Sequence, residues 1–313
     1  MIISASRRTD IPAFYSDWFL DKIQQGYVMV RNRVNYHQVS KVSLTPEVVD
    51  CIVFWTKNPA PMLDKLDSLR KYPFYFQFTL TPYNGAVETH IACKEAIIDS
   101  FVALSKKVGK RRVIWRYDPI FLTDYMDLNY HLKAFEFLIR QLGDYTDKCV
   151  ISFIDYYKHI KKNFESLRIK SLPENIIREV AHGFADVAHS HGLTIESCAE
   201  DIDLSGLGIN HGKCIDDKLI SEIIGTDIIA EKDGTQRKSC GCVASIDIGS
   251  YNTCDHRCLY CYANFSRKMV EKHMAEHDPA SPLLTGRICG DDTITERKAA
   301  SCKIAQDCLF PLR

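Results

Sequence analysis

The chain has 313 residues, of which 46% are apolar and 26% charged, the profile of a globular protein with a sizeable core. No internal repeat or low-complexity linker divides it, and its length allows one large domain. Forty basic residues face forty acidic ones, which argues against binding nucleic acid or an anionic membrane over the whole surface. Thirteen cysteines are the anomaly, because an odd number cannot all pair.

The N-terminus, MIISASRRTD, lacks the basic stretch and apolar stretch that together mark a secretory signal. The apolar runs fall far short of the roughly 20 residues that a membrane helix needs. We therefore expect a cytoplasmic protein without a membrane partner. In a reducing cytosol, clustered cysteines more often bind metal or do redox chemistry than form disulfides.

Short β-branched and aromatic runs alternate with amphipathic stretches along the chain. The runs predict strands at Ile2–Ser6, Cys51–Trp55, Phe74–Thr79, Val113–Tyr117, Cys149–Ile154, Thr194–Cys198 and Ala244–Ile248, with a weaker one at Tyr27–Arg31. The clearest helices are predicted at Asp127–Leu142 and Pro173–His191. This alternation predicts an α/β fold, a TIM-like parallel β/α barrel, complete or partial, over residues 1–284. Residues 285–313 are expected to form a loosely attached tail.

Polar residues follow six of the predicted strands, and in a barrel such positions meet at the mouth where active sites are built. Lys57, Arg116 and Asp118 are our candidate catalytic residues. An arginine and an aspartate at a strand end could orient a substrate or cofactor carboxylate. They could equally form an internal ion pair that braces the loop, and Lys57 is open in the same way.

The strongest local signal is YNTCDHRCLYCYA, residues 251–263, which places Cys254, Cys258 and Cys261 in a C-x3-C-x2-C spacing. Three thiolates in one tight loop suit a [4Fe–4S] cluster, in which they bind three irons and leave the fourth open. A structural zinc ion needs a fourth ligand, and His256 is poorly placed for it on so short a loop. A zinc knuckle completed by a distant cysteine stays open as the alternative.

A second set of thiols lies in the cysteine-bearing segment 198–265: Cys198, Cys214, Cys240 and Cys242. A C-x-C pair with two remote thiols can complete a zinc site or an auxiliary [4Fe–4S] site. Alternatively, Cys198 is a buried strand residue and the C-G-C sequence is a tight turn. Three other cysteines fall inside predicted strands or a helix and are expected in the core: Cys51, Cys93 and Cys149.

The cysteine spacing, with aromatic Tyr260 before the last thiol, resembles the signature of the radical S-adenosylmethionine superfamily, in particular the branch of spore photoproduct lyase. From Met1 to Leu284 the chain resembles the family called domain of unknown function 1848, which carries such a cluster at its C-terminus. The segments TDIP, residues 9–12, and FWTKNP, residues 54–59, are similar to second- and third-strand segments of that branch. The resemblance implies a circularly permuted radical S-adenosylmethionine barrel, in which Met1–Ser6 lies beside Ala244–Ile248.

The same resemblance implies a [4Fe–4S] cluster and S-adenosyl-L-methionine as cofactors. Reductive cleavage of the latter would give a 5′-deoxyadenosyl radical that abstracts hydrogen from a small-molecule or peptide substrate. Tyr260 would lie near the adenine, and Asp10 and Thr79 are candidate cofactor contacts, because the usual Gly-Gly-Glu segment is not evident. The electron donor would be a protein such as flavodoxin or ferredoxin.

Two other classes of function compete with this one. A non-catalytic barrel stabilised by zinc or an iron–sulfur cluster could act as a binding protein. Nucleic-acid repair rests on the lyase-like branch alone, and the zero net charge argues against a nucleic-acid partner.

Overall fold

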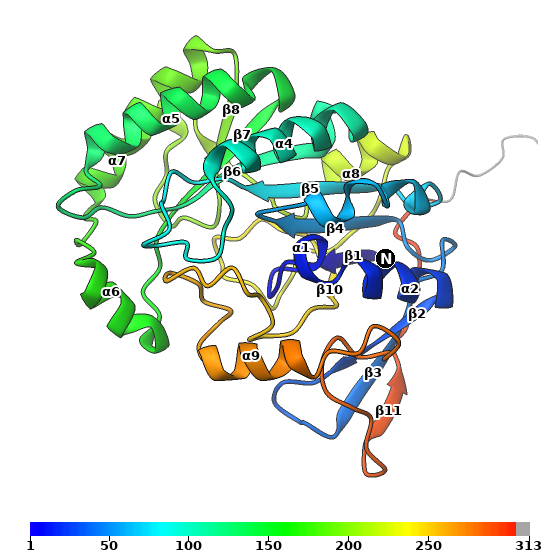
Figure 1. The fold of residues 1–313 in the computed structure, drawn as a ribbon. Helices are drawn as coiled ribbons and strands as arrows, with labels where there is room; N and C mark the ends of the chain where they lie inside the picture. The colour runs from blue at the N-terminus through cyan, green and yellow to red at the C-terminus, as the bar shows by residue number, and fades with distance from the viewer. Residues whose placement is uncertain (305–313) are drawn as a thin grey trace, which may run out of the picture.

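The computed structural model describes residues 1–304, and an eight-stranded sheet forms its centre (Figure 1). Neighbouring strands pair in parallel throughout, in the order β10-β1-β4-β5-β6-β7-β8-β9. Their bounds are β1 Ile2–Ala5, β4 Cys51–Thr56, β5 Phe74–Thr79, β6 Val113–Ile120, β7 Lys148–Phe153, β8 Thr194–Ser197, β9 Asn210–His211 and β10 Ile246–Asp247. The sheet is therefore of the α/β class, as predicted.

Most helices of the described chain cover one face of this sheet, whereas α8 packs on the other (Figure 1). Their bounds are α1 Ile11–Phe14, α2 Ser16–Gln25, α3 Ala60–Leu63, α4 Lys94–Val108, α5 Leu128–Leu142, α6 Lys161–Leu167, α7 Glu174–Ser190, α8 Asp217–Ile224 and α9 Arg267–Ala275. The predicted helices at Asp127–Leu142 and Pro173–His191 are α5 and α7. Phe135 of α5 stacks between Trp115 of β6 and Phe184 of α7, with ring centroids 5.1 and 4.2 Å apart. The apolar stripes of both helices are thus buried where the periodicity placed them.

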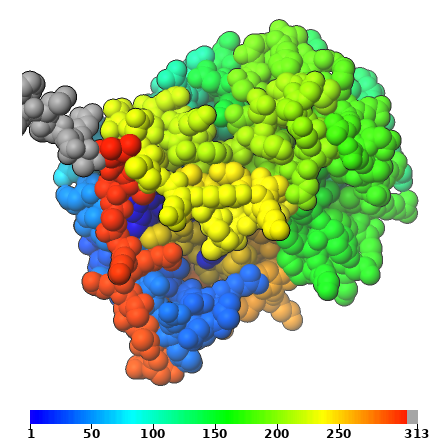
Figure 2. All heavy atoms as spheres, turned by 180° about the vertical axis from the view of Figure 1, so that it is seen from behind, coloured from blue at the N-terminus to red at the C-terminus, as the bar shows by residue number. Residues whose placement is uncertain are grey.

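The opposite face of the sheet is covered by the irregular segment between β8 and β10. Inward-facing strand residues pack there against Cys214, Ile215 and Val243: Ile2, Cys51, Val53, Tyr75, Ile114 and Val150. In the space-filling view this segment, yellow, lies across the centre of the molecule (Figure 2). Because both faces are covered, the central strands are buried continuously, which is why they read as apolar runs in the sequence.

The predicted neighbourhood of the first and last strands is confirmed. β1 pairs with β10 in parallel, with Ile3 opposite Ile246 and Ser4 opposite Asp247. Asp247 accepts hydrogen bonds from Ser4 Oγ at 2.8 Å and Ser6 Oγ at 2.7 Å. β10 is only two residues long, shorter than the predicted Ala244–Ile248. Within residues 1–304, no pairing joins β9 to β10, so the sheet stays open at that point.

A second, three-stranded sheet lies beside the first and corrects two predictions. It has the order β11-β3-β2, with β2 at Tyr27–Arg31, β3 at Gln38–Ser43 and β11 at Thr293–Glu296. The weakly predicted strand Tyr27–Arg31 exists, but outside the main sheet. The expectation of a loose tail is wrong for its described part, because β11 pairs with β3 and the terminal amine of Met1 donates to Ala300 O at 2.7 Å.

The prediction of three core cysteines is confirmed for two of them and wrong for the third. Cys51 and Cys149 are fully buried in β4 and β7, as predicted. Cys93 is exposed and lies just before the first residue of α4, so its assignment to the core is wrong. The orientation of a residue at a helix start is set by the preceding loop. The local sequence does not show which side of that loop faces water. No helix in the described part of the chain is long and apolar enough to cross a bilayer.

Candidate functional site at the carboxyl edge of the sheet

The three-cysteine loop lies between β10 and α9 and docks on the segment that follows β5. Leu259 N donates to Val87 O at 3.0 Å, and His90 N donates to His256 O at 3.1 Å. Asn252, in the left-handed region with φ 55°, accepts bonds from the backbone of Phe265 at 2.8 Å and Ser266 at 3.1 Å. The loop is thus closed on itself and held at the carboxyl edge of the parallel sheet.

The thiols of Cys254, Cys258 and Cys261 are partly buried and belong to this single loop. Burial raises the pKa of Cys258 to about 12, against the opposing effect of the nearby Lys57 ammonium. Burial also raises the pKa of Cys254 and Cys261. Bringing these thiols to the thiolate form therefore requires positive charge, which a metal centre supplies.

The spacing of these sulfur atoms distinguishes between kinds of centre. Sulfur ligands of one tetrahedral zinc ion stand about 3.8 Å apart, given a Zn–S distance of about 2.3 Å. The three sulfurs do not all lie within 4.8 Å of one another. Thiolates on a [4Fe–4S] cluster each bind a different iron and stand farther apart. The donor set fits such a cluster better than a single zinc ion.

His256, inside the cysteine motif, is engaged by Asp10 through one ring nitrogen, while its buried Nδ1 has no hydrogen-bond partner among the described residues. Its Nε2 lies 2.8 Å from Asp10 Oδ2, and both residues are buried. Asp10 also accepts from Lys57 N at 2.7 Å and caps α1 through Ala13 N at 3.0 Å. The predicted cofactor contact Asp10 thus connects the ends of β1 and β4 to the cysteine loop.

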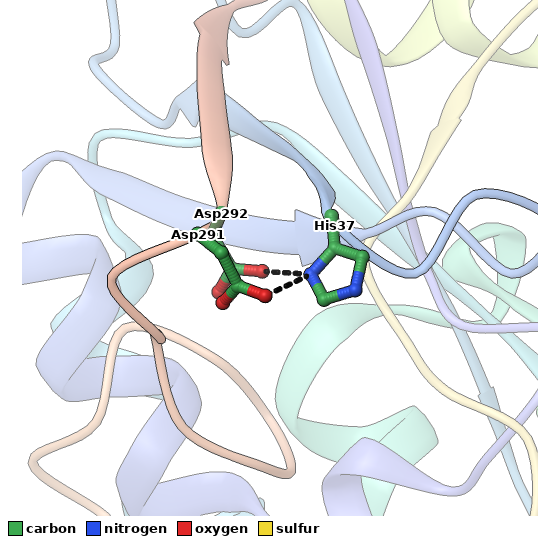
Figure 3. A group of neighbouring side chains, drawn as sticks. All are labelled: His37, Asp291 and Asp292. Atoms are coloured by element: carbon green, nitrogen blue, oxygen red, sulfur yellow. Dashed lines mark ion pairs between the residues drawn. The ribbon is translucent and has the colours of Figure 1, made fainter.

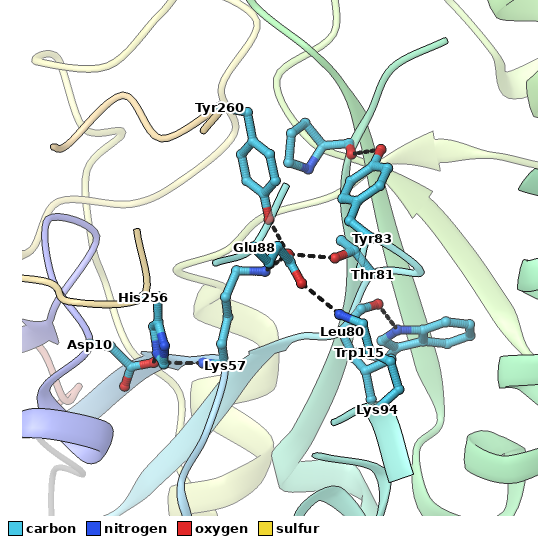
Figure 4. A network of polar contacts seen from close by, with 11 residues as sticks. Asp10, Lys57, Leu80, Thr81, Tyr83, Glu88, Lys94, Trp115, His256 and Tyr260 are labelled. Atoms are coloured by element: carbon cyan, nitrogen blue, oxygen red, sulfur yellow. Dashed lines mark hydrogen bonds and ion pairs between the residues drawn. The ribbon is translucent and has the colours of Figure 1, made fainter. Parts of the chain in front are cut away.

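A buried carboxylate, Glu88, is the centre of the polar network beside the loop (Figure 4). It accepts from Lys57 Nζ at 2.7 Å, Lys94 Nζ at 2.6 Å and Thr81 Oγ1 at 2.7 Å, and from the hydroxyl of Tyr260. Burial acts to raise the pKa of Glu88, but the two ammonium groups hold it at about 2. Burial likewise acts to lower the pKa of Lys57, yet Glu88 and Cys258 raise it on balance.

Tyr260 fills the space between this network and an aromatic cluster. Its ring centroid lies 5.7 Å from that of Tyr83 and 6.1 Å from that of Phe121. Lys57 Nζ stands 5.5 Å from the centroid of the same ring. The structure thus brings Tyr260, Lys57 and Asp10 together around the cysteine loop. Thr79 is half-buried at the end of β5, and its contact with a cofactor stays a prediction.

Arg116 and Asp118 form an ion pair at the end of β6, in which Arg116 is buried and Asp118 half-buried. Arg116 Nε lies 3.1 Å from Asp118 Oδ2, and the hydroxyl of Ser152 donates to the other carboxylate oxygen. Burial acts to raise the pKa of Asp118, but Arg116 lowers it. Arg116 Nη1 also points at Cys214 Sγ, 2.9 Å away. The bracing role is therefore present, and any contact of the pair with a substrate stays a prediction.

The second cysteine set gathers under the sheet's inner face. Cys198 Sγ lies 3.2 Å from Cys214 Sγ, and Ile215 N donates to Cys242 Sγ at 3.4 Å. All four belong to or border the cluster of residues that packs on the inner face of β4–β7. These predicted ligands therefore come together, although they are 44 residues apart in the chain.

A third group, His37 with Asp291 and Asp292, joins the second sheet to the segment before β11 (Figure 3). His37 Nδ1 lies 3.1 Å from Asp291 Oδ2. Asp292 is already engaged by Arg31, whose Nη1 and Nη2 lie 2.6 and 2.7 Å from its two oxygens. A guanidinium on both oxygens leaves little negative charge for a cation, so we interpret the group as an ion-pair clasp.

Several residues of the site lie outside the sequence-based prediction. Glu88 and Lys94 stand in a polar loop and at a helix start, where nothing distinguishes them from solvent-exposed charges. Ser152 interrupts an otherwise apolar run, a signal that could have marked it. Arg7 belongs to the polar residues after β1, but only the fold brings it near Cys242.

Comparison with known proteins adds a family and no activity. No curated protein matches the chain. One solved structure, of a candidate alpha-L-fucosidase from Bacteroides thetaiotaomicron, is similar at 13% identity over 51% of this chain and 67% of that one, with a TM-score of 0.25. So low a score carries no argument about fold or function. The family described as domain of unknown function (DUF1848) matches residues 2–263, which hold both cysteine sets, and the chain belongs to that family.

Proposed function

We propose that the protein is a [4Fe–4S] enzyme that binds S-adenosyl-L-methionine, cleaves it reductively and abstracts hydrogen from a small-molecule or peptide substrate. The observation that carries the proposal is the donor set of Cys254, Cys258 and Cys261. Three thiols come from one loop at the carboxyl edge of a parallel sheet, and Asp10 engages Nε2 of the neighbouring His256. Three protein ligands leave one iron of a cluster open to a small molecule.

The residues around the loop support this assignment electrostatically. A cluster bound by three thiolates is negatively charged, and Lys57 is the cation whose charge acts on Cys258. Glu88 holds Lys57 through Nζ at 2.7 Å, and Asp10 holds its backbone. The cluster would supply one electron to the sulfonium of the cofactor. Lys57, Glu88 and Tyr260 would orient the groups beside it and exclude water.

The sheet topology supports a permuted barrel as the scaffold. A strand that leads into the cysteine loop, β10, lies beside β1, and the other strands follow in order across the sheet. Carboxyl ends of parallel strands are where such sheets bind ligands. The alternative, a non-catalytic binding protein stabilised by zinc or an iron–sulfur cluster, predicts no turnover of S-adenosylmethionine.

The test is product formation by anaerobically reconstituted protein, reduced with dithionite in the presence of S-adenosylmethionine. We expect 5′-deoxyadenosine to accumulate with the wild type and with Cys289→Ser, which changes an exposed cysteine far along the chain. We expect none with Cys258→Ala. If the wild type forms none while holding about four irons per chain, or if Cys258→Ala forms as much, the proposed activity is wrong.

A further inference from the structure

We infer that Cys198, Cys214, Cys240 and Cys242 bind one zinc ion through four thiolates, at a site separate from the three-cysteine loop. This inference does not depend on the proposed reaction. It depends on the distances between sulfur atoms, on the charges that face them, and on the segment of chain that they hold.

The sulfur contacts favour a single ion over a cluster. Cys198 Sγ and Cys214 Sγ are 3.2 Å apart. Ligands of one tetrahedral zinc stand about 3.8 Å apart, close to this contact, whereas thiolates on a [4Fe–4S] cluster bind different irons and stand farther apart. Within the described part of the chain, no three of the four thiols lie within 4.8 Å of one another, so the remaining thiols would move closer when the ion binds. Among the described residues, no sulfur–sulfur contact joins Cys254, Cys258 and Cys261. The two sets therefore suit different centres.

Two arginines provide the charge that such a centre requires. Four thiolates around Zn²⁺ leave a net charge of about −2, which is costly to bury without cations. Arg116 Nη1 lies 2.9 Å from Cys214 Sγ, and its fork also holds Asp118. Arg7 lies near Cys242 and Cys214, and its buried Nη2 has no hydrogen-bond partner within residues 1–304. Thiolates held by a metal would accept from both guanidinium groups.

The backbone around the four thiols is already ordered by the sheet. Cys214 O accepts from Tyr75 Oη at 2.6 Å and from Gln77 Nε2 at 3.0 Å, both on the inner face of β5. Asp233 N donates to Cys242 O at 2.9 Å, and Ile215 N donates to Cys242 Sγ at 3.4 Å. An amide that donates to a sulfur atom is typical of a thiolate that binds metal.

The position of the site gives zinc a structural task. Its ligands come from the end of β8, from the turn after β9 and from the turn before β10, so one ion would join three separate stretches. Between β8 and β10 the only α-helix is α8, of eight residues. A four-thiolate ion would tie these stretches to one another, in addition to the apolar contacts that the segment makes with the sheet. Through Arg116 it would also support the Asp118 end of β6.

The test is metal analysis of three full-length proteins purified without added metal. The triple variant Cys254→Ala, Cys258→Ala, Cys261→Ala removes the loop ligands and is expected to keep about one zinc per chain and no iron. The double variant Cys240→Ser, Cys242→Ser is expected to lose at least nine-tenths of the zinc and to keep iron on the loop. Cys289→Ser, an exposed cysteine, is the control and should match the wild type.

A second measurement covers the case in which the double variant does not fold. Wild-type protein is alkylated with iodoacetamide with and without a zinc chelator, and the modified cysteines are mapped by mass spectrometry. We expect the chelator to expose Cys198, Cys214, Cys240 and Cys242 together, while Cys51 stays protected by burial. The inference is overturned if the triple variant holds iron with sulfide or no zinc, or if the chelator changes none of the four.

Discussion

Replacing Glu88 with glutamine tests whether this buried carboxylate is the counter-ion that holds the site together. The variant Glu88→Gln keeps the shape of the side chain and one oxygen acceptor but removes its charge. Lys57 and Lys94 would then stand side by side, with 13% and 26% of their side chains exposed and no facing carboxylate. An unpaired charge at such a position is destabilising.

The magnitude follows from the pKa of Glu88, which falls from 4.5 to about 2 in the folded protein. One pKa unit equals about 1.36 kcal/mol, so the charged form is favoured by roughly 3 kcal/mol. Removing one partner of a buried ion pair costs about 3–5 kcal/mol, which agrees. We expect Glu88→Gln to lower the free energy of unfolding by about 3 kcal/mol at pH 7, or the urea midpoint by about 1 M.

The pH dependence of stability gives a second, independent test of the Glu88 charge. Because the folded pKa is depressed, the stabilisation is fully present above pH 4.5 and is lost as the pH falls through about 2. The difference between wild type and Glu88→Gln should therefore shrink as urea unfolding is repeated from pH 5 downward. Glu174→Gln, which breaks an exposed pair with Arg178, is the control and should cost less than about 1 kcal/mol. If Glu88→Gln costs no more than this control, the carboxylate is not a buried counter-ion.

Three further perturbations test other parts of the structure. Gly249→Ala would place a Cβ against the side chain of Ser6 with no room for it. The melting temperature should therefore fall strongly, and Ser6→Gly should partly restore it. An unchanged melting temperature would contradict this close approach. Asp10→Asn removes the charge that holds His256. This variant should lose bound iron to a chelator several times faster than the control variant Asp17→Asn, which changes an exposed residue. Phe184→Ala removes a ring from the aromatic stack under β6. The free energy of unfolding, measured with urea, should fall by about 3–5 kcal/mol. A fall below about 1 kcal/mol would show that neighbouring side chains close the cavity.

The central strands could be predicted because both faces of the sheet are covered. Residues such as those of β4 and β5 are apolar at successive positions, so the runs stand out from their surroundings. The edge strands β9 and β10 have two residues each, too few for any pattern. β11, at Thr293–Glu296, is exposed along its whole length and owes its strand geometry to pairing with β3. Nothing in its own residues favours burial.

The residues of the candidate site also fall into those that local sequence could predict and those that it could not. The cysteine motif could be recognised because all three thiols lie within eight residues of one another, where spacing alone limits the geometry. Lys57 and Asp10 could be named from their positions after strands. Glu88 could not, because its importance comes from Lys57, Lys94 and Tyr260, which approach it from different parts of the chain.

Local patterns in the amino-acid sequence specify which segments become the buried strands and helices, and that one loop carries three thiols. These properties depend on neighbours within a few residues, so local pattern and spacing express them. Only the tertiary structure shows that Glu88 is buried between two lysines and that Arg116 meets Cys214. Each of these is a contact between distant parts of the chain, and its energy arises only when folding removes both partners from water.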